Sequence, residues 1–412
     1  MEGIIVQKYG GSSVATIEKI KNVARRIIET KMLGYKVIVV VSAMGSTTNN
    51  LLSMANEISQ DVSPREIDML LSTGEQVTIS LLAMAIQSMG HDAISLTGPQ
   101  CGVHAHNNYS KARIKDINTD RLINELSKGK IVIAAGFQGE NEYGDIVTLG
   151  RGGSDTSAVA LAGAVNAEKC EIYTDVDGVY TSDPRIVPNA KLLNEISYDE
   201  MLELASLGAK ILHSRSVEIA RNYKVPLVVR SSFNNSPGTE VKELDNLEKA
   251  MVRGITLDRN IVKISILGVP DKPGIAYNIF SKLAESNIGI DMIIQNVNRD
   301  LINDISFSVK NEDFKQALQI TEDICTEINA KGVIYDESVV KLSIVGTGIM
   351  GNSDVITLFF KTLYNLGINL KMISTSEIKI SCIIDGEKSI QAMNELHNKF
   401  QLDKEGYDSK AV

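Results

Sequence analysis

Tryptophan is absent from the 412-residue sequence, and only eight prolines and four cysteines are present. The cysteines are widely separated and form no C-x-x-C pair, which disfavours a disulfide framework and a cysteine-based metal site. We therefore expect free thiols in a reducing cytosol. His104 and His106 lie on either side of Ala105 without an accompanying cluster of metal ligands, so ordinary loop residues are the simpler interpretation.

Long apolar runs and blocks of basic residues are also missing. Without a run of about 18 apolar residues, and without the apolar core and cleavage site of a signal peptide, the chain is expected to be cytoplasmic and to have no membrane partner. The net charge of −9 argues against a general nucleic-acid binder. The length allows two to four domains, and 43% hydrophobic and 23% charged residues are ordinary for a soluble protein.

The first 230 residues alternate between stretches typical of strands and stretches typical of helices. Ile4 to Val6 predict a buried strand, apolar residues recur at helical spacing from Val14 to Ile28, and KVIVVVSAMG (36–45) predicts a fully apolar strand. Such strands are typical of a parallel sheet that helices cover on both faces. The pattern predicts an α/β fold, an open, doubly wound, mainly parallel sheet with ligands at the carboxyl ends of its strands.

A polar stretch, FNNSPGTEVKELDNLEKA (233–250), interrupts this alternation and is typical of a linker. Beyond it the sequence repeats, because KISILG (263–268) returns as KLSIVG (341–346) and IDMI (290–293) returns as LKMI (370–373). Two copies are too few for a solenoid, so we expect two small α+β modules packed together. The predicted domains are residues 1–233, a linker at 234–260 that includes the first strand of the tail, and modules at 261–335 and 336–412.

The second repeat contains a G-x-G-x-x-G pattern at Gly346, Gly348 and Gly351, which taken alone suggests a dinucleotide-binding fold. Too few residues follow it for two βαβ halves, and no acidic residue lies about 20 positions on at a clear strand end. The equivalent turn of the first repeat, GVPDKPGIA, also lacks the glycines. Dinucleotide binding is therefore disfavoured.

Four stretches combine small or charged residues where strands end or helices begin: KYGGSS (8–13), SAMGSTT (42–48), GRGGSDTS (150–157) and YTDVDGVYTSDPR (173–185). In the first, Ser13 is expected to cap a helix, and a strand, a glycine turn and a helix start together make an anion site. It is not a Walker A loop, because the lysine precedes the glycines. Backbone amides near Lys8 and Arg151 are what phosphoryl transfer needs to balance charge on the moving group.

KYGGSS resembles the K-[FY]-G-G-[ST]-S signature of the aspartokinases, which share the amino-acid kinase fold. The similarity continues in family order through VVVSAMG, LLSTGEQ, TLGRGGSDTSA, YTDVDGVYTSDPR and GAKIL. The repeat in the tail resembles paired ACT regulatory domains, with DKPGIA and IDMIIQN in the first and ISTSEI in the second. The resemblance covers nearly the whole chain and is closest to the lysine- and threonine-regulated type.

The resemblance implies transfer of the γ-phosphoryl group of ATP, with Mg²⁺, to the side-chain carboxylate of L-aspartate. The product would be 4-phospho-L-aspartate, at the first step of the pathway to lysine, threonine and methionine. Because the attacking carboxylate has a pKa of about 4, no general base is needed. Lys8 and Asp155 are expected to be catalytic, Asp155 by orienting Lys8 or Mg²⁺. Expected ATP-binding residues are Lys8, Tyr9, Gly10, Gly11, Ser12, Ser42, Ser154, Thr174, Asp175, Tyr180, Thr181, Ser182, Asp183, Pro184, Arg185 and Lys210.

For aspartate, Arg151 is the expected carboxylate clamp and Glu75 the expected partner of the ammonium group, with Thr48, Gly152, Gly153 and Ser154 nearby. Each has a structural alternative. Arg151 would also suit a surface ion pair, Glu75 a capping box and Asp155 a helix cap. Ser42 and Thr48 would also serve to close a turn, and Asp177-Gly178 more simply makes one.

The ACT-like modules are expected to bind free amino acids, with carboxylates meeting the effector ammonium and turn amides its carboxylate. Asp271-Lys272-Pro273-Gly274 would also suit a plain turn. Lysine, threonine or both are expected to inhibit, most simply in concert, by favouring an inactive assembly. The chain is expected to be a homo-oligomer, either a dimer through the ACT modules or a tetramer, and Met251 would suit the start of a separate small regulatory subunit. Expected effector residues are Asp271, Lys272, Pro273, Gly274, Ile275, Ala276, Gly289, Ile290, Asp291, Gln295, Val355, Ile356, Asn369, Leu370, Ser376 and Glu377.

Three other functions compete with this interpretation. Glutamate, acetylglutamate and uridylate kinases share the sheet but not KYGGSS with GRGGSDTS, and none explains the tail. A fusion to homoserine dehydrogenase is excluded by the length. A catalytically dead amino-acid sensor would show erosion at Lys8, Glu75, Arg151 or Asp155, and all four are intact.

Overall fold

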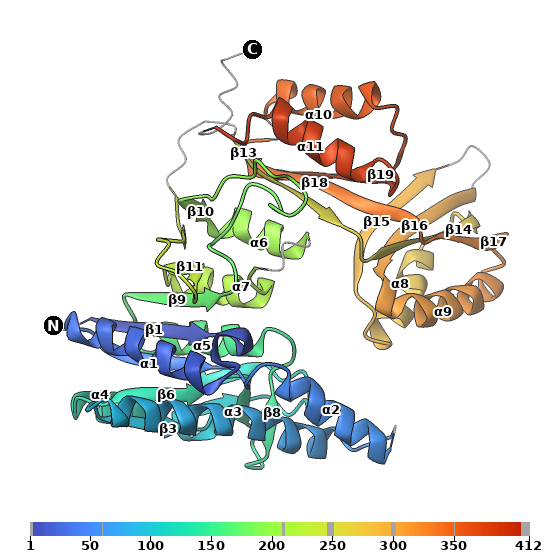
Figure 1. The fold of residues 1–412 in the computed structure, drawn as a ribbon. Coiled ribbons are helices and arrows are strands. Elements are labelled where there is room, and N and C mark those ends of the chain that lie inside the picture. The colour runs from blue at the N-terminus through green and yellow to red at the C-terminus, as the bar shows by residue number, and fades with distance from the viewer. Residues whose placement is uncertain are drawn as a thin grey trace. The chain divides into compact units, whose positions relative to one another are not determined.

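The computed structural model describes residues 3–59, 61–207, 211–244, 251–297, 302–349 and 351–404. The chain forms two compact units (Figure 1). The first contains Met1–Tyr180 and Leu192–Asp245, and the second contains Thr181–Lys191 and Asn246–Val412. The chain therefore leaves the first unit after Tyr180, contributes a short segment to the second, and returns.

An eight-stranded sheet forms the centre of the first unit, in the order β10-β12-β11-β9-β1-β2-β6-β3. The five pairs from β3 to β11 are parallel, and β12 runs antiparallel to β11. The mainly parallel α/β fold expected from the sequence is confirmed. The strands are β1 (Ile4–Tyr9), β2 (Lys36–Val41), β3 (Ala93–Leu96), β6 (Ile131–Ala135), β9 (Lys169–Thr174), β10 (Glu195–Ser197), β11 (Leu227–Ser231) and β12 (Thr239–Lys242).

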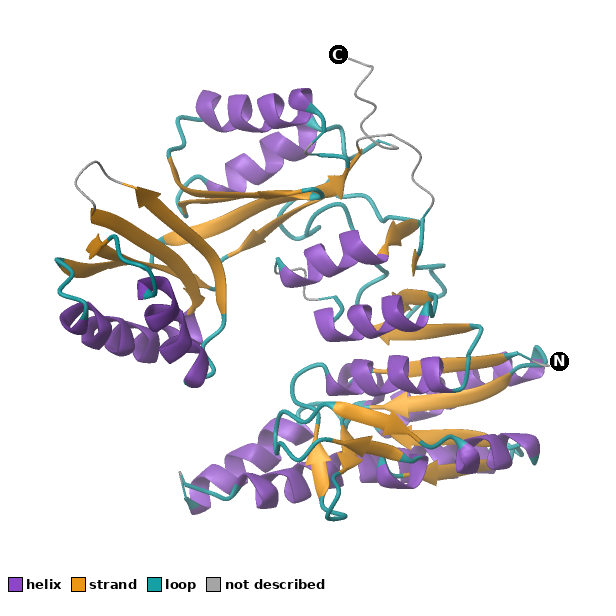
Figure 2. Ribbon diagram, turned by 180° about the vertical axis from the view of Figure 1, so that it is seen from behind, coloured by secondary structure: helices purple, strands orange, loops and turns teal. Residues whose placement is uncertain are grey.

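Helices lie on both faces of this sheet (Figure 2). On one face Ile20 and Val23 of α1 pack with Leu82 of α3 against alternate residues of β2 and β6, such as Val39 and Ile133. The helices of this unit are α1 (Ile17–Met32), α2 (Thr47–Ile58), α3 (Pro64–Ser88), α4 (Asp120–Ser127), α5 (Gly153–Ala164), α6 (Tyr198–Ser206) and α7 (Ser214–Tyr223).

The sequence predicts no apolar run long enough to span a membrane. Among the described residues, α3 is nevertheless the one helix that is long and apolar enough to do so. Half of its most apolar window is buried inside the unit, and polar residues such as Asp68, Ser72 and Glu75 are buried with it. A buried helix of this kind is typical of the core of a globular domain.

A second, four-stranded sheet lies in the first unit, in the order β5-β4-β7-β8. His104 lies on it, with Nδ1 at 2.6 Å from Asp116 Oδ1 and Nε2 at 3.5 Å from Glu140 Oε1. Within the described ranges no three histidine, cysteine or acidic side chains are grouped as a metal site would need. The strands are β4 (Val103–Ala105), β5 (Ile114–Ile117), β7 (Gln138–Glu140) and β8 (Ile146–Thr148).

The second unit contains two antiparallel four-stranded sheets, in the orders β15-β16-β14-β17 and β13-β18-β20-β19. Helices α8 and α9 pack against the first sheet, and α10 and α11 pack against the second. The strands are β13 (Met251–Asp258), β14 (Ile261–Pro270), β15 (Ile290–Val297), β16 (Ile302–Lys310), β17 (Gly332–Asp336), β18 (Val339–Thr347), β19 (Leu370–Ser376) and β20 (Lys379–Asp385). The helices are α8 (Ile275–Glu285), α9 (Phe314–Glu327), α10 (Ser353–Asn365) and α11 (Ser389–Lys399).

The described part of residues 234–260 contains two strands, whereas the sequence predicts one. β12 belongs to the sheet of the first unit, where Val241 is buried, and β13 pairs with β18 at the edge of the last sheet. The second module therefore takes one strand from the chain that precedes the first module. Strands as short as β12 leave too little alternation to separate them from a polar linker.

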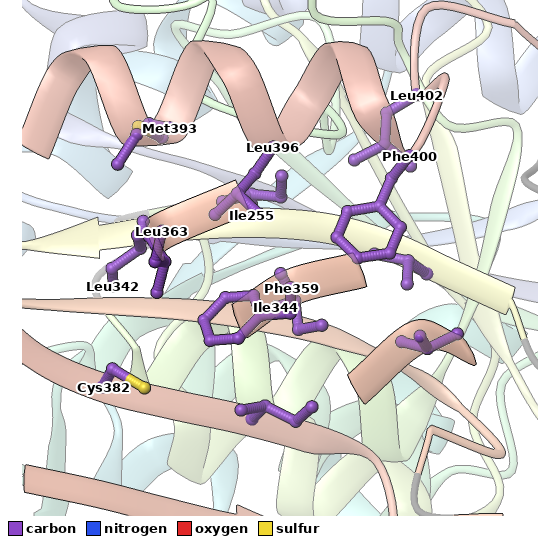
Figure 3. Packing of buried hydrophobic residues seen from close by; sticks show 14 of the residues in the cluster. Ile255, Leu342, Ile344, Phe359, Leu363, Cys382, Met393, Leu396, Phe400 and Leu402 are labelled. Carbon is purple, nitrogen blue, oxygen red and sulfur yellow. The ribbon is translucent and has the colours of Figure 1, made fainter. Parts of the chain in front are cut away.

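Figure 3 shows the core of this second module, in which Ile255 of β13 packs with Phe359 of α10 and Leu396 of α11. A smaller apolar cluster joins the two modules and includes Ile261 and Met292 from one side and Met372 from the other. The G-x-G-x-x-G pattern begins within β18, at Gly346, and ends before α10, beside an antiparallel sheet. This is not the parallel βαβ setting that binds dinucleotides, as expected from the sequence.

Candidate active site and effector pocket

The loop after β1 lies at the carboxyl edge of the parallel sheet, among the loops after β2 and β9. The Gly10 N–H donates to Tyr173 O at 3.4 Å, and the Gly45 N–H donates to Gly11 O at 3.0 Å. A Cβ on Gly11 would lie 2.8 Å from Ala43 O, so this contact requires glycine. The loop after β1 therefore contacts both the loop after β2 and the end of β9 at this edge of the sheet.

Ser13 does not cap a helix, and this prediction was wrong. Residues Gly11–Val14 form a short 3₁₀ turn, and α1 starts only at Ile17, where the Thr16 hydroxyl accepts the Lys19 N–H at 3.3 Å. Ser13 is buried instead, and its hydroxyl donates to Ser232 Oγ at 2.9 Å. Anion-binding amides at this site would therefore come from the glycine loop and the 3₁₀ turn rather than from the N-terminus of α1.

Lys8 and Asp155 form an ion pair beside this loop. Lys8 Nζ lies 2.6 Å from Asp155 Oδ1, and both side chains are largely buried. Helix α5 begins after Gly152, which has a φ of 69°, and no described side chain caps it. The structure thus shows the predicted contact of Asp155 with Lys8, and it shows no N-cap by Asp155.

Glu75 lies in the middle of α3, which rules out a role in a capping box. Its side chain is buried, Oε1 accepts the Ala43 N–H at 3.0 Å, and Oε2 has no hydrogen-bond partner among the described residues. Burial raises the pKa of the Glu75 carboxyl to about 7, and the Ala43 N–H opposes this shift. A buried carboxylate oxygen without a donor is suited to receive a ligand ammonium group.

Arg151 is exposed and lies in a loop shaped by two glycines in the left-handed region, Gly150 with a φ of 74° and Gly152 with a φ of 69°. A Cβ on Gly152 would lie 2.4 Å from the His213 side chain, so glycine is required there both by conformation and by space. Gly153 and Ser154, the other residues expected to bind aspartate here, are buried in the first turn of α5.

Ser42 and Thr48 are both half-buried in the loop and first turn that follow β2. The Ser42 N–H donates to Tyr9 O at 3.1 Å, which ties this loop to the end of β1. The hydroxyl that closes the turn belongs to Thr47, which donates to Met44 O at 2.6 Å. Turn closure is thus carried by Thr47, so it does not account for Thr48.

At the end of β9, the Thr174 hydroxyl donates to Asp175 Oδ1 at 3.1 Å. Asp177 accepts from Asn234 Nδ2 at 2.7 Å and from the Tyr180 hydroxyl at 3.5 Å. These bonds suit the predicted role of Asp177 in a turn. Thr174, Asp175 and Tyr180 all belong to the first unit.

The remaining residues expected to bind nucleotide, Thr181 to Arg185, belong to the second unit. There Thr181 Oγ1 lies 2.9 Å from His397 Nε2, and the Ser182 hydroxyl donates to Ile255 O at 3.2 Å. These two side chains are buried in that unit, which the sequence motif does not indicate. Arg185 pairs with Asp183 at 2.8 Å, and Lys210 lies outside the described residues.

A pocket of about 190 Å³ lies in the first module of the second unit. Its wall includes Asn303, which sequence reasoning missed, with Nδ2 donating to Asp271 Oδ1 at 3.1 Å. Asn303 is buried, and its Oδ1 accepts no hydrogen bond from the described residues. Asn303 faces this turn only because β16 pairs with β14 in a register that joins it to Val269. The other lining residues are Val269, Pro270, Asp271, Lys272, Pro273, Gly274, Ile275, Ala276, Gln295 and Ile305.

Seven of the predicted effector residues, Asp271 to Ala276 and Gln295, line this pocket. Asp291 does not line it and instead pairs with the buried ammonium of Lys341. Gly289 and Ile290 also lie outside its wall. Val355 is fully buried in the core of the second module. The others from that module, Ile356, Asn369, Leu370, Ser376 and Glu377, lie on or beside α10 and β19.

Comparisons with family models, with curated proteins and with solved structures all indicate the same family. The amino acid kinase family matches residues 3–231, and the ACT domain matches residues 264–323 and 342–400. The chain is 50% identical over 404 residues to the aspartokinase of Geobacillus stearothermophilus, covering 98% of both chains. This chain belongs to the aspartokinase family. It is also 48% identical to the aspartokinase of Corynebacterium glutamicum over 415 residues, covering 99% of this chain and 98% of that one.

Solved aspartokinases share the fold. Escherichia coli aspartokinase III, crystallised with aspartate and ADP, superposes with a TM-score of 0.81 at 24% identity and covers 97% of this chain and 100% of its own. The aspartate kinase from Synechocystis is 46% identical with a TM-score of 0.55, and the match covers 96% of this chain and 69% of that one. The chain is thus an aspartate kinase with ACT domains, as the motifs of both units predict.

Proposed function

We propose that this aspartokinase binds its substrates at the carboxyl edge of the first sheet and transfers the γ-phosphoryl group of ATP to the side-chain carboxylate of L-aspartate. Glu75 Oε2 binds the aspartate ammonium group, and Arg151 clamps a substrate carboxylate in two-point fashion. Thr48, Gly152, Gly153 and Ser154 complete this part of the site. The unpartnered Oε2 of Glu75 is the observation that carries the proposal, because a buried carboxylate oxygen without a donor is costly unless a ligand supplies one.

ATP lies beside the loop after β1. Lys8 spans the β- and γ-phosphates, and the backbone amides of Gly10, Gly11 and Ser12 hold the moving phosphoryl group. The ion pair with Asp155 holds the Lys8 ammonium in place before ATP arrives. The rest of the nucleotide site is lined by Tyr9, Ser42, Ser154, Thr174, Asp175 and Tyr180. From Tyr180 the chain continues through Thr181, Ser182, Asp183, Pro184 and Arg185.

The acceptor carboxylate of aspartate is already ionised at neutral pH, so the attack needs no base. Positioning of the two substrates and neutralisation of the phosphate charge then account for catalysis. Mg²⁺ held by ATP phosphates needs only one or two protein carboxylates. We assign Asp155, which lies beside Lys8, as the carboxylate that would hold Mg²⁺. The bound ion would further neutralise the charge of the phosphates.

The pocket of the first ACT module binds a feedback effector, lysine or threonine. Asp271 and the unpartnered Oδ1 of Asn303 take the effector ammonium group, and the first turn of α8 takes its carboxylate. E. coli aspartokinase III has also been crystallised with lysine and aspartate. β15 and β19 are terminal strands of their sheets, a kind of edge that pairs between chains, so we expect a homo-oligomer formed through the ACT modules.

The test is ADP release with ATP, Mg²⁺ and L-aspartate, with hydroxylamine present to trap the acyl phosphate. It is run without effector, with lysine, with threonine and with both. Aspartate-dependent product that is lost only with both amino acids supports the kinase site and concerted inhibition together. Product that neither amino acid affects supports the kinase site and removes the effector proposal. Absence of trapped product contradicts the proposed chemistry.

A further inference from the structure

Asp68 is a fully buried carboxylate in the second turn of α3, where it accepts four hydrogen bonds. Its Oδ2 accepts the backbone N–H groups of Ser110 and Thr148, both at 2.8 Å. Its Oδ1 accepts the hydroxyls of the same two residues, at 3.2 Å from Ser110 and 2.8 Å from Thr148. One side chain therefore joins α3 to two segments that are distant from it in the sequence.

Both segments adjoin the loop that carries Arg151. Thr148 ends β8, and the glycine loop begins two residues later at Gly150. Ser110 packs against that loop, since a Cβ on Gly150 would lie 3.0 Å from Ser110 O. Ser110 itself has a φ of 65°, a conformation that a serine keeps only when its surroundings hold it there.

Arg215 also joins these two segments, so Asp68 is not the only side chain that fixes the start of the loop. Its guanidinium donates to Leu149 O at 2.9 Å and to Ala112 O at 3.0 Å. The Ala112 N–H donates to Thr148 O at 2.9 Å. Asp68 is the member of this arrangement that lies on α3, the helix that also carries Glu75.

Glu75 follows Asp68 by seven residues, about two turns or 10 Å along the helix axis. A rigid helix thus carries the proposed partner of the substrate ammonium and also the anchor of the loop with the proposed carboxylate clamp. We propose that Asp68 is a positioning residue for aspartate, fixing the Arg151 loop at the separation from Glu75 that the substrate requires. This inference rests on the proposed roles of Arg151 and Glu75.

Asp68→Ala and Asp68→Asn separate hydrogen bonding from charge. An asparagine at this position keeps all four bonds when its Oδ1 accepts the two backbone N–H groups and its Nδ2 donates to the two hydroxyls, which then act as acceptors. Alanine keeps none. We expect Asp68→Ala to raise the KM for aspartate by about tenfold or more while the KM for ATP changes less than about twofold, and Asp68→Asn to stay within about threefold of the unaltered enzyme.

Glu125→Ala is the matched control, because Glu125 of α4 is another buried carboxylate of the first unit, paired with Lys128 and Lys130 beyond the end of that helix. It should leave the KM for aspartate unchanged. If Asp68→Ala fails to fold, the double variant Ser110→Ala, Thr148→Val removes only the two hydroxyl bonds, and a several-fold rise in the aspartate KM is expected. ADP binding by calorimetry shows that each variant retains its nucleotide site.

Two results would overturn the inference. One is an aspartate KM that Asp68→Ala leaves unchanged or raises only in step with the KM for ATP, and the other is an Asp68→Asn enzyme as impaired as Asp68→Ala. Arg151→Ala and Glu75→Gln are measured in the same assay. If these two leave aspartate binding intact, the proposed substrate site itself is wrong, whereas an effect of these two without an effect of Asp68→Ala removes only the role of Asp68.

Discussion

Lys8 Nζ lies 2.6 Å from Asp155 Oδ1, so the carboxyl end of β1 and the first turn of α5 are joined by an ion pair beside the glycine loop. The pair places a cation where a phosphate tail would lie and keeps that cation oriented before a nucleotide binds. A carboxylate so close to the lysine also prevents an uncompensated buried charge in the free enzyme.

Replacing Lys8 by methionine removes the cation and keeps most of the side-chain volume. Loss of one charged contact to the phosphoryl group should lower kcat by a factor of about 10²–10³, equivalent to about 3–4 kcal/mol of transition-state stabilisation. The measurement is the rate of hydroxylamine-trapped product. Lys21→Met, an exposed lysine on α1, is the control and should retain full activity. A Lys8→Met enzyme with near-normal turnover would contradict the assignment.

The KM for aspartate should depend on pH through Glu75. Burial raises the pKa of this carboxyl to about 7, and only the ionised form attracts the substrate ammonium group. The ionised fraction falls about tenfold between pH 8 and pH 6, so the KM for aspartate should rise about tenfold over that interval. Glu75→Gln should have a high KM that is flat with pH. A flat profile for the unaltered enzyme would show that Glu75 does not bind aspartate.

The motifs predict the two glycine loops, the doubly wound fold and the paired modules, because each is encoded in a short local pattern. Contacts set by long-range pairing are not encoded in that way. Asn303 joins the effector pocket through its register with Val269, and Asp68 meets Thr148 across 80 positions of sequence. β13 likewise joins the second module although the first module follows it in the chain. No local pattern distinguishes these pairings from others.

Glu75 should also lower the stability of the substrate-free enzyme above neutral pH. Its pKa is about 4.5 in the unfolded chain and about 7 in the folded protein, so the folded state binds the proton more tightly. The free energy of unfolding therefore falls as pH rises from about 4.5 to about 7, by up to about 3 kcal/mol, and this contribution is constant above that range.

Glu75→Gln removes this titration and should be more stable than the unaltered enzyme at pH 8, with the difference vanishing near pH 4. Urea unfolding at the two pH values measures it. Exposed Glu18 on α1 provides a control, since Glu18→Gln should change stability little at either pH. A difference of the same size at both pH values would show that packing, not ionisation, is responsible.

The last prediction concerns the effector pocket, where Asn303 presents an unpartnered Oδ1 beside Asp271. A hydrogen bond to a charged ammonium group contributes about 1.5–3 kcal/mol, so Asn303→Ala should raise the concentration of effector needed for half-inhibition by about 10- to 100-fold. Inhibition curves for lysine and for threonine are measured separately, each relative to the uninhibited rate of the same variant.

The curve that shifts identifies which amino acid occupies this pocket, because the other effector would bind elsewhere and keep its curve. Asn311→Ala is the control, since Asn311 is exposed just beyond the far end of β16 and should alter neither curve. If Asn303→Ala leaves both curves in place, the orphaned oxygen does not meet an effector. The turn from Asp271 to Gly274 is then the plain turn that its sequence also allows.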